Sequence, residues 1–150
     1  MGGDNATLTI NSSAAPVALA LSGNGTAAAT ANLTVSPGTL AFGAVTLGTT
    51  APAKLLTVTN SGGAAASGVA IANSNAGEFP VSGNTCGTSL AAGTSCTLNV
   101  AYSPAAAGID SGTLTISYTG GTNIPIGLSG TGSAAASATT AGATTVAQRR

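Results

Sequence analysis

The residues of this 150-residue chain that could do chemistry are few, and the two cysteines are the most informative of them. Cys86 and Cys96 flank the segment GTSLAAGTS, which is typical of a turn-rich loop. Two cysteines without a histidine do not make a zinc site. We predict a disulfide between them, which implies an exported protein. The alternative is a pair of free buried thiols in a cytosolic protein.

Few other side chains could act as acids, bases or activated nucleophiles. The chain has no histidine, which excludes Ser-His-Asp and Cys-His catalysis in its usual form. The charged residues are Asp4, Glu78, Asp110, Lys54, Arg149 and Arg150. The three acids lie far apart in the sequence, which argues against a glycosidase carboxylate pair and against a calcium cage. We therefore expect no catalytic residue, no metal site, no cofactor and no enzymatic activity.

The scarcity of charge also limits the possible partners. Charged residues make up 4% of the chain, and its net charge is zero; the usual charged share is about 25%. Without a basic patch, nucleic acid is not an expected partner. No apolar run approaches the roughly 20 residues that span a bilayer, so we expect no membrane insertion. A surface without charges lacks the usual protection against edge-to-edge association, which suits a protein that assembles.

The elements that must position these residues are strands. Apolar side chains occupy every second position in many short segments, which Gly, Asn, Ser or Pro clusters separate. These segments are 7–10, 16–21, 31–35, 39–45, 54–60, 68–72, 78–81, 95–102, 112–118 and 123–129. Such alternation predicts an all-β protein, an antiparallel β-sandwich.

The alternation also predicts which side chains face the core. The inward set is Leu33, Val35, Leu40, Phe42, Val45, Leu55, Val58, Val69, Ile71, Phe79, Leu98, Val100, Tyr102, Leu114, Ile116, Ile124, Ile126 and Leu128. We expect the hydroxyl of Tyr102 to reach the surface. Pro125 cannot donate to a ladder, so its strand should lie at an edge or have a gap in its ladder there.

One predicted hairpin occurs twice in the chain. Thr7 to Ile10 repeats as Thr113 to Ile116 at an offset of 106, and the sequence Leu-Ser-Gly of 21–23 repeats at 128–130. The apolar residues of the first hairpin are Leu8, Ile10, Val17, Leu19 and Leu21, and those of the closing hairpin are Leu114, Ile116, Ile124, Ile126 and Leu128. We therefore divide the chain into a surplus hairpin (1–30), one sandwich (31–132) and an Ala/Thr/Ser-rich tail or linker (133–150).

The order of motifs between residues 31 and 132 resembles a known family. The motifs are LTVSPGTLAFGAVTLGT (33–49), LTVTNSGG (56–63), CGTSLAAGTSCTLNVAYSP (86–104), GIDSGTLTIS (108–117) and IGLSGTG (126–132). They resemble the abnormal-spindle/Hydin (ASH) type of immunoglobulin-like domain, which forms tandem repeats in bacterial surface proteins of the choice-of-anchor D type. The resemblance implies an immunoglobulin-like sandwich of seven to eight strands without enzymatic activity.

A lysine crosslink is the one covalent reaction that the sequence leaves open. Surface immunoglobulin-like domains sometimes join a Lys to an Asn or Asp with the help of a buried acid. Lys54 is the only lysine, and Glu78 or Asp110 could assist it. A buried ion pair is costly, and Lys54 should lie on the face opposite Leu55. We therefore interpret Lys54 as a solvated side chain.

The surplus hairpin can be interpreted in three ways. It is the remnant of a preceding domain in a tandem array, or it completes a sheet in a neighbouring copy, or it pairs with an edge of its own sandwich. The charge-free edges favour the second over the third. We expect a non-enzymatic structural module of an exported bacterial surface protein, extracellular or at the cell surface, within a fibre or stalk. Its partners would be copies of itself or adjacent immunoglobulin-like repeats. The alternative is an adhesin domain that binds a glycan or protein through loops such as 72–78 or 103–111. That interpretation predicts exposed aromatic side chains, for which Tyr118 is the only candidate.

Overall fold

The computed structural model describes residues 3–11, 13 and 15–136, and the regular structure within them consists of strands. The chain divides into two compact units, Met1–Thr30 and Ala31–Arg150. Of the predicted tail 133–150, Ser133 ends the last strand, and residues 137–150 lie outside the described part.

The first unit is a two-stranded antiparallel hairpin. Strand β1 (Gly3–Ile10) pairs with β2 (Val17–Asn24) over eight consecutive residue pairs, from Gly3 opposite Asn24 to Ile10 opposite Val17. Thr and Leu or Ile alternate in β1, which places the apolar side chains on one face of the hairpin. Every residue of both strands is exposed.

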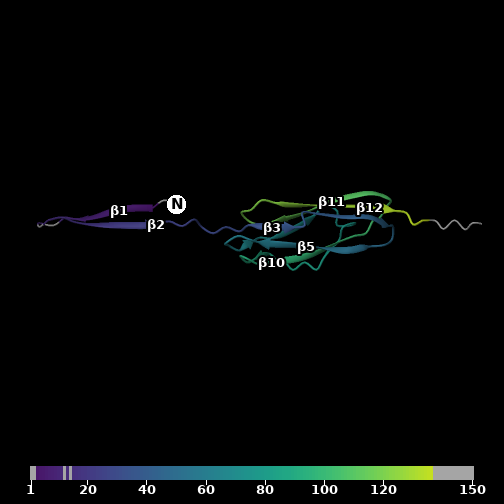
Figure 1. Cartoon of the computed structure of the whole chain (residues 1–150), viewed down its shortest axis with the longest axis horizontal. Coiled ribbons are helices and arrows are strands. Elements are labelled where there is room, and N and C mark those ends of the chain that lie inside the picture. Colours follow the sequence, from purple (N-terminus) through teal and green to yellow (C-terminus); the bar gives the residue numbers. More distant parts are fainter. Residues whose placement is uncertain (1–2, 12, 14, 137–150) are drawn as a thin grey trace, which may run out of the picture. The chain divides into compact units, whose positions relative to one another are not determined.

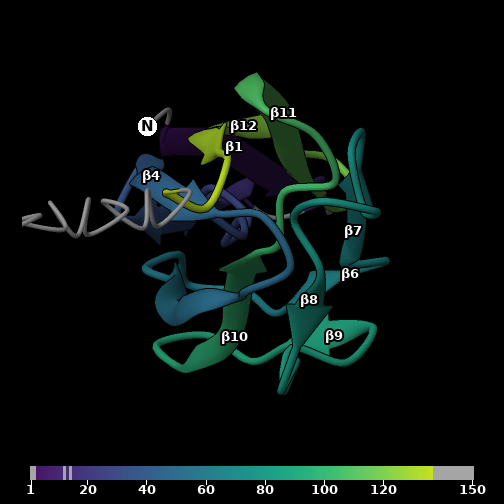
Figure 2. The same cartoon turned by 90° about the vertical axis from the view of Figure 1, so that its right-hand side faces the viewer.

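The second unit is a sandwich of two four-stranded sheets (Figure 1). One sheet has the order β3-β5-β10-β8, with β3 Leu33–Ser36, β5 Ala51–Asn60, β10 Ser95–Tyr102 and β8 Val81–Ser82. The other has the order β4-β12-β11-β7, with β4 Thr39–Thr46, β12 Ile124–Ser133, β11 Gly108–Ser117 and β7 Ala70–Asn73. Strands β6 (Ala66–Ser67) and β9 (Ser89–Leu90) form a separate short pair. Figure 2 shows β10 and β8 in one layer and β4, β12 and β11 in the other.

This architecture confirms the predicted all-β sandwich, with one departure from a fully antiparallel arrangement. Strand β4 runs parallel to β12, from Thr39 opposite Gly127 to Thr46 opposite Ser133. The chain crosses from β3 in one sheet to β4 in the other through a two-residue connection. That crossing brings β4 to β12 in the parallel direction, and alternation within a segment carries no information on the direction of its neighbours.

The core lies between the two sheets and is mainly aliphatic. Its fully buried large side chains include Leu56, Val58, Phe79, Leu98, Val100, Tyr102, Leu114, Ile116 and Ile126. Val35, Phe42, Val45, Ile71 and Ile124 pack against this core while partly exposed. The inward face predicted for most strands therefore agrees with the structure.

The predicted phase of β5 was wrong at Leu55. Leu55 is 55% exposed, whereas Leu56 is completely buried. The two adjacent leucines offer alternation in either phase, but Val58 fixes the inward face. Positions that share a face are two residues apart, so Leu56 and Lys54 lie on the side of Val58, and Leu55 faces outward.

Pro125 lies near the start of β12, an inner strand of its sheet. It lies opposite Thr115 of β11, and the pairing of β12 with β4 begins only at Gly127. The predicted gap in the ladder is therefore present, since Pro125 has no partner in β4. A proline is tolerated there because the missing N–H removes no ladder hydrogen bond.

Asn60 is the one buried polar side chain of the described core, and its hydrogen bonds tie three loops together. Its amide nitrogen donates to the carbonyl oxygens of Ala64 and Leu90, at 2.9 and 3.0 Å. Its side-chain oxygen accepts from the backbone N–H groups of Asn32 and Gly62, both at 3.1 Å. Buried amides are stable in a core only when they are satisfied in this way.

Candidate functional site

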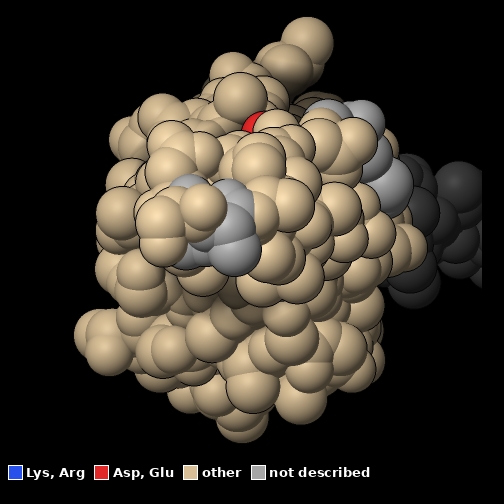
Figure 3. Space-filling view, turned by 90° about the vertical axis from the view of Figure 1, so that its left-hand side faces the viewer, with Lys and Arg blue, Asp and Glu red and all other residues tan. Residues whose placement is uncertain are grey.

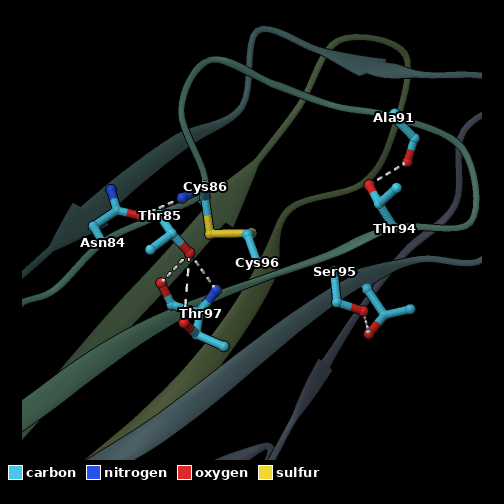
Figure 4. The surroundings of a disulfide bond; sticks show 9 residues. Asn84, Thr85, Cys86, Ala91, Thr94, Ser95, Cys96 and Thr97 are labelled. Atoms are coloured by element: carbon cyan, nitrogen blue, oxygen red, sulfur yellow. Dashed lines mark hydrogen bonds between the residues drawn. A yellow bond between two sulfur atoms is a disulfide. The ribbon is translucent and has the colours of Figure 1, made fainter.

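Cys86 and Cys96 form the disulfide expected from the sequence (Figure 4). Cys96 lies in β10 opposite Val58, and Cys86 belongs to the segment between β8 and β9. Both cysteines are buried in the core. The bridge closes the loop 86–96, in which the hydroxyl of Thr94 donates to the carbonyl of Ala91 at 2.8 Å. The disulfide therefore fixes a loop to the sandwich and leaves no thiol for catalysis.

Hydrogen bonds beside the disulfide hold the same segment against β10. The backbone N–H of Thr85 donates to the carbonyl of Thr97, and the N–H of Thr97 donates to the hydroxyl oxygen of Thr85, both at 2.9 Å. Asn84 accepts a hydrogen bond from the N–H of Cys86 through its side-chain oxygen. Figure 4 shows these residues around the bridge. The arrangement is structural, because its polar groups are satisfied by one another.

The groups considered for a lysine crosslink have separate partners. The Lys54 ammonium donates to the carbonyl of Ala41 and lies 5.3 Å from the centre of the Phe42 ring. The carboxylate of Glu78 accepts a hydrogen bond from the side-chain amide of Asn75 at 3.0 Å. Lys54 is exposed, in agreement with a solvated lysine, although it lies on the same face as Leu56.

Tyr102 forms the centre of an aromatic cluster that joins the two sheets. Its ring stacks on Phe79 with a centroid distance of 4.8 Å and lies 5.7 Å from the Phe42 ring. Its hydroxyl donates a short hydrogen bond to a carboxylate oxygen of Asp110 in β11. Tyr102 is completely buried, so the expectation that its hydroxyl reaches the surface was wrong. Desolvation by burial and the hydrogen bond to Asp110 raise the pKa of Tyr102 above its ordinary value.

Two glycines of β12 make room for this cluster and for the chain that follows it. A Cβ atom added at Gly130 would lie 2.3 Å from a ring carbon of Tyr102. One added at Gly132 would lie 2.1 Å from the carbonyl oxygen of Ala106. Gly130 lies directly opposite Asp110 in the ladder of β11 and β12. Gly130 thus leaves space for the Tyr102 ring, and Asp110 accepts the hydrogen bond of its hydroxyl.

The closing hairpin β11–β12 lies in the sandwich, but the apolar face of the β1–β2 hairpin is uncovered. In the closing hairpin, Leu114, Ile116 and Ile126 are completely buried. The corresponding side chains of the first hairpin are exposed by about half: Leu8 50%, Ile10 59%, Val17 64%, Leu19 55% and Leu21 47%. An exposed apolar patch of five aliphatic side chains is unusual on a soluble protein and typical of an interaction surface.

The two hairpins have the same pairing along this face. The pair Ala6–Leu21 of the first hairpin corresponds to Gly112–Leu128 of the second. In the same way, Leu8–Leu19 corresponds to Leu114–Ile126, and Ile10–Val17 corresponds to Ile116–Ile124. The next pair along, Asp4–Gly23, corresponds to Asp110–Gly130. The match of Asp4 to Asp110 was missed from the sequence. It could have been found by extending the repeat three residues upstream from Thr7 at the same offset.

The described part of the chain offers a weak setting for a small ligand. A shallow depression of about 450 Å³ is lined by Ile71, Asn73, Ala76, Pro80, Val81 and Asn84. Both asparagines already bond to backbone groups: Asn73 donates to the carbonyl of Phe79, and Asn84 accepts from Cys86. Tyr118, named for the adhesin alternative, packs against the core and accepts a hydrogen bond from the backbone of Leu33. No polar side chain of this depression is therefore left without a partner in the described residues.

Charge is sparse on the molecule's surface, as the composition requires. Among the described residues in view in Figure 3, only one small acidic spot is charged. Among the residues that the structure describes, no three His, Cys, Asp or Glu side chains gather in a way that could hold a metal ion. A search of the same residues finds no helix long and apolar enough to cross a membrane.

Comparison with solved structures finds several similar chains, of which the first shares the fold. The VesB protease of Vibrio cholerae matches with a TM-score of 0.50 at 22% identity, over 66% of this chain and 31% of that one. Domains 4 and 5 of the S-layer protein SbsC match with a TM-score of 0.47 at 15% identity, over 85% of this chain and 58% of that one. WR4, an MSP family member of C. elegans, matches with a TM-score of 0.43 at 12% identity, over 67% and 97% of the two chains. This chain thus covers less than two thirds of the first two proteins.

Sequence comparison identifies the family. No curated protein matches the chain significantly. The model of the family described as abnormal spindle-like microcephaly-associated, ASPM-SPD-2-Hydin (ASH), matches residues 29–123. That span begins just before β3 and extends through β11 to the start of the closing strand. It contains the disulfide, the aromatic cluster and Asp110. The chain therefore belongs to the ASH family.

Proposed function

We propose that this chain is a non-enzymatic structural module of an exported bacterial surface protein and a building block of a fibre or extended stalk. The observation that carries the proposal is the uncovered apolar face of the β1–β2 hairpin. A lone hairpin is marginal in water. Burying five aliphatic side chains contributes on the order of 1.5–3 kcal/mol each before entropy is counted. The hairpin therefore gains stability from a partner that covers this face.

The chemistry of the described residues supports a structural role over catalysis. The chain has no histidine. Asp110 accepts a hydrogen bond from the Tyr102 hydroxyl, and Glu78 accepts one from the side-chain amide of Asn75. Each carboxylate thus serves the packing of its own neighbourhood. The depression near Ile71 offers neither a charged nor an aromatic group, so no observation favours the adhesin alternative.

The disulfide and the uncharged surface support export and assembly. Disulfides persist in oxidising compartments and are rare in the cytosol. A surface with few charges provides little electrostatic repulsion between molecules. It also changes little with salt or pH, because few of its groups titrate or are screened. These properties suit a subunit exposed to an external medium.

The path of the chain through the sandwich suits linear assembly. The sandwich begins at Leu33, which lies opposite Asn60 at one end of β5. It ends at Ser133, whose carbonyl accepts a hydrogen bond from Leu47, and the neighbouring Gly132 lies beside Ala106 just beyond Tyr102. Tyr102 lies opposite Ala51, at the other end of β5. Successive modules joined at these ends would extend in one direction, as a stalk or fibre requires.

The proposed assembly is tested by size-exclusion chromatography and negative-stain microscopy of the full chain over a range of concentrations. We expect oligomers or filaments that grow with concentration. Deletion of residues 1–26 should leave only the monomer, and deletion of residues 137–150 serves as a control that keeps the hairpin. A full chain that remains monomeric at every concentration, unaffected by the hairpin deletion, would contradict assembly through this hairpin.

A further inference from the structure

The closing hairpin of the sandwich is secured by a specific contact at one end of its apolar face. The ring of Tyr102 lies against the backbone of Gly130, where even a methyl group would approach within 2.3 Å. Its hydroxyl donates to Asp110, directly opposite Gly130. The contact combines a steric requirement for glycine with a directional requirement for an acceptor. It is therefore more specific than the burial of aliphatic side chains beside it.

The β1–β2 hairpin carries both parts of the same contact without the tyrosine. Asp4 lies opposite Gly23, on the face that bears Leu8 and Leu19. A Cβ atom added at Gly23 would meet no atom within 4 Å. An isolated β-hairpin gains nothing from a glycine at such a position, because glycine weakens strands. Gly23 and Asp4 become useful only when an aromatic hydroxyl lies over them.

We propose that the β1–β2 hairpin closes a second ASH body of the kind formed by residues 31–107, whose tyrosine at the position of Tyr102 lies over Gly23 and donates to Asp4. This inference rests on the proposed assembly and names its partner. The partner contributes the strands that flank β11–β12 in this chain, β4 and β7, and the opposite sheet. Leu8, Ile10, Val17, Leu19 and Leu21 then occupy the positions that Leu114, Ile116, Ile124, Ile126 and Leu128 occupy here.

The length of the segment between the hairpin and Leu33 limits which body the hairpin can close. Thr26 corresponds to Ser133 at the offset of 107. Seven residues lead from Thr26 to Leu33, and they span at most about 25 Å when fully extended. In the sandwich, the ends marked by Leu33 and Ser133 are separated by the length of β5, whose nine steps from Ala51 to Asn60 cover about 30 Å. From Asn24, the last residue of β2, the connection to Leu33 is at the limit of that reach, which favours closure of a neighbour's body in a head-to-tail contact.

The test uses the full chain, with its own body as the probe. Gly130→Val places a branched side chain against Tyr102 and opens the closing position. If the hairpin is a second closing hairpin, this variant keeps its β-sheet circular dichroism and forms oligomers, because each hairpin closes a neighbour's body. Adding Gly23→Val should lower the oligomeric fraction by about tenfold or more, since overpacking a core contact weakens binding to that extent.

The matched control is Ser22→Val in the Gly130→Val background. Ser22 neighbours Gly23 but points to the opposite face of the hairpin, so the same added bulk should leave the oligomers intact. The proposal is overturned if Gly130→Val unfolds to the same extent with and without Gly23→Val. It is also overturned if Gly130→Val remains a folded monomer, or if its oligomers tolerate Gly23→Val. These outcomes are independent of whether the unsubstituted chain assembles, so the two proposals can fail separately.

Discussion

The hydroxyl of Tyr102 in β10 donates a hydrogen bond to the carboxylate of Asp110 in β11 and thereby joins the two sheets of the sandwich. Both partners lie at the end of the core where Gly130 leaves room for the aromatic ring. Hydrogen bonds to a charged acceptor are stronger than those between neutral groups. This contact therefore defines how the closing hairpin is positioned against the opposite sheet.

The contact makes stability depend on pH in the alkaline range. Burial and Asp110 raise the pKa of Tyr102 in the folded state, whereas in the unfolded chain it titrates at its ordinary value of about 10. Above that pH the unfolded state loses the proton first. We therefore expect the free energy of unfolding to decrease as the pH rises above about 10. Urea unfolding of the chain and of Tyr102→Phe across this range measures the effect. Parallel pH curves for the two proteins would contradict it.

Much of the fold follows from local pattern, but the Tyr102 contact does not. Alternation identifies β10 and β11 as strands and places Tyr102 on the inward face with Leu98 and Val100. The acceptor for its hydroxyl comes from the other sheet, and no local signal points to Asp110. The parallel pairing of β4 with β12 is hidden for the same reason. Contacts between sheets depend on topology, which a single sequence specifies only indirectly.

The repeat is the exception, because it carries structural information across the chain. Matching Leu8 to Leu114 and Leu19 to Ile126 correctly relates two pairs that lie opposite each other in their respective ladders. The step from an offset of 106 to one of 107 falls in the connecting turn, so the strand register is unaffected. The same repeat leads to Asp4 and Gly23 once Asp110 and Gly130 are known to hold Tyr102.

The two adjacent leucines of β5 should differ strongly in their contribution to stability. Leu56 is completely buried, so Leu56→Ala should lower the free energy of unfolding by about 2–5 kcal/mol. Leu55 is largely exposed, so Leu55→Ala should change it by less than about 0.5 kcal/mol. Urea unfolding of both variants measures the difference. Equal losses would mean that β5 does not have the phase described.

Replacing the side-chain amide of Asn60 should lower the free energy of unfolding. Asn60→Ala leaves the carbonyl of Leu90 and the N–H groups of Asn32 and Gly62 without their partner. We expect a loss of at least about 2 kcal/mol, since each buried group left unsatisfied is costly. Asn123→Ala, at an exposed position, is the control and should have little effect. Thermal or urea unfolding distinguishes them, and a tolerated Asn60→Ala would show that water replaces the amide.

The disulfide should stabilise the sandwich without being needed for its topology. It closes a loop with a sequence separation of 10, which corresponds to about 2–3 kcal/mol in the chain-entropy model. The double variant Cys86→Ala/Cys96→Ala should therefore keep its circular dichroism spectrum and unfold at a lower urea concentration. Thiol labelling of the denatured, unreduced chain should detect no free cysteine. Full labelling would show that the bridge is not formed.

The two faces of the β1–β2 hairpin should respond differently to an added charge. Leu19 belongs to the apolar face, and its neighbour Ala18 points to the other side. Leu19→Asp places a carboxylate where the proposed partner would bury an aliphatic side chain, and an unpaired buried charge is strongly unfavourable. Sedimentation velocity should therefore show weaker self-association for Leu19→Asp than for Ala18→Asp, although both variants have the same net charge. If both substitutions weakened association equally, the cause would be general repulsion, and the apolar face would not be the contact surface.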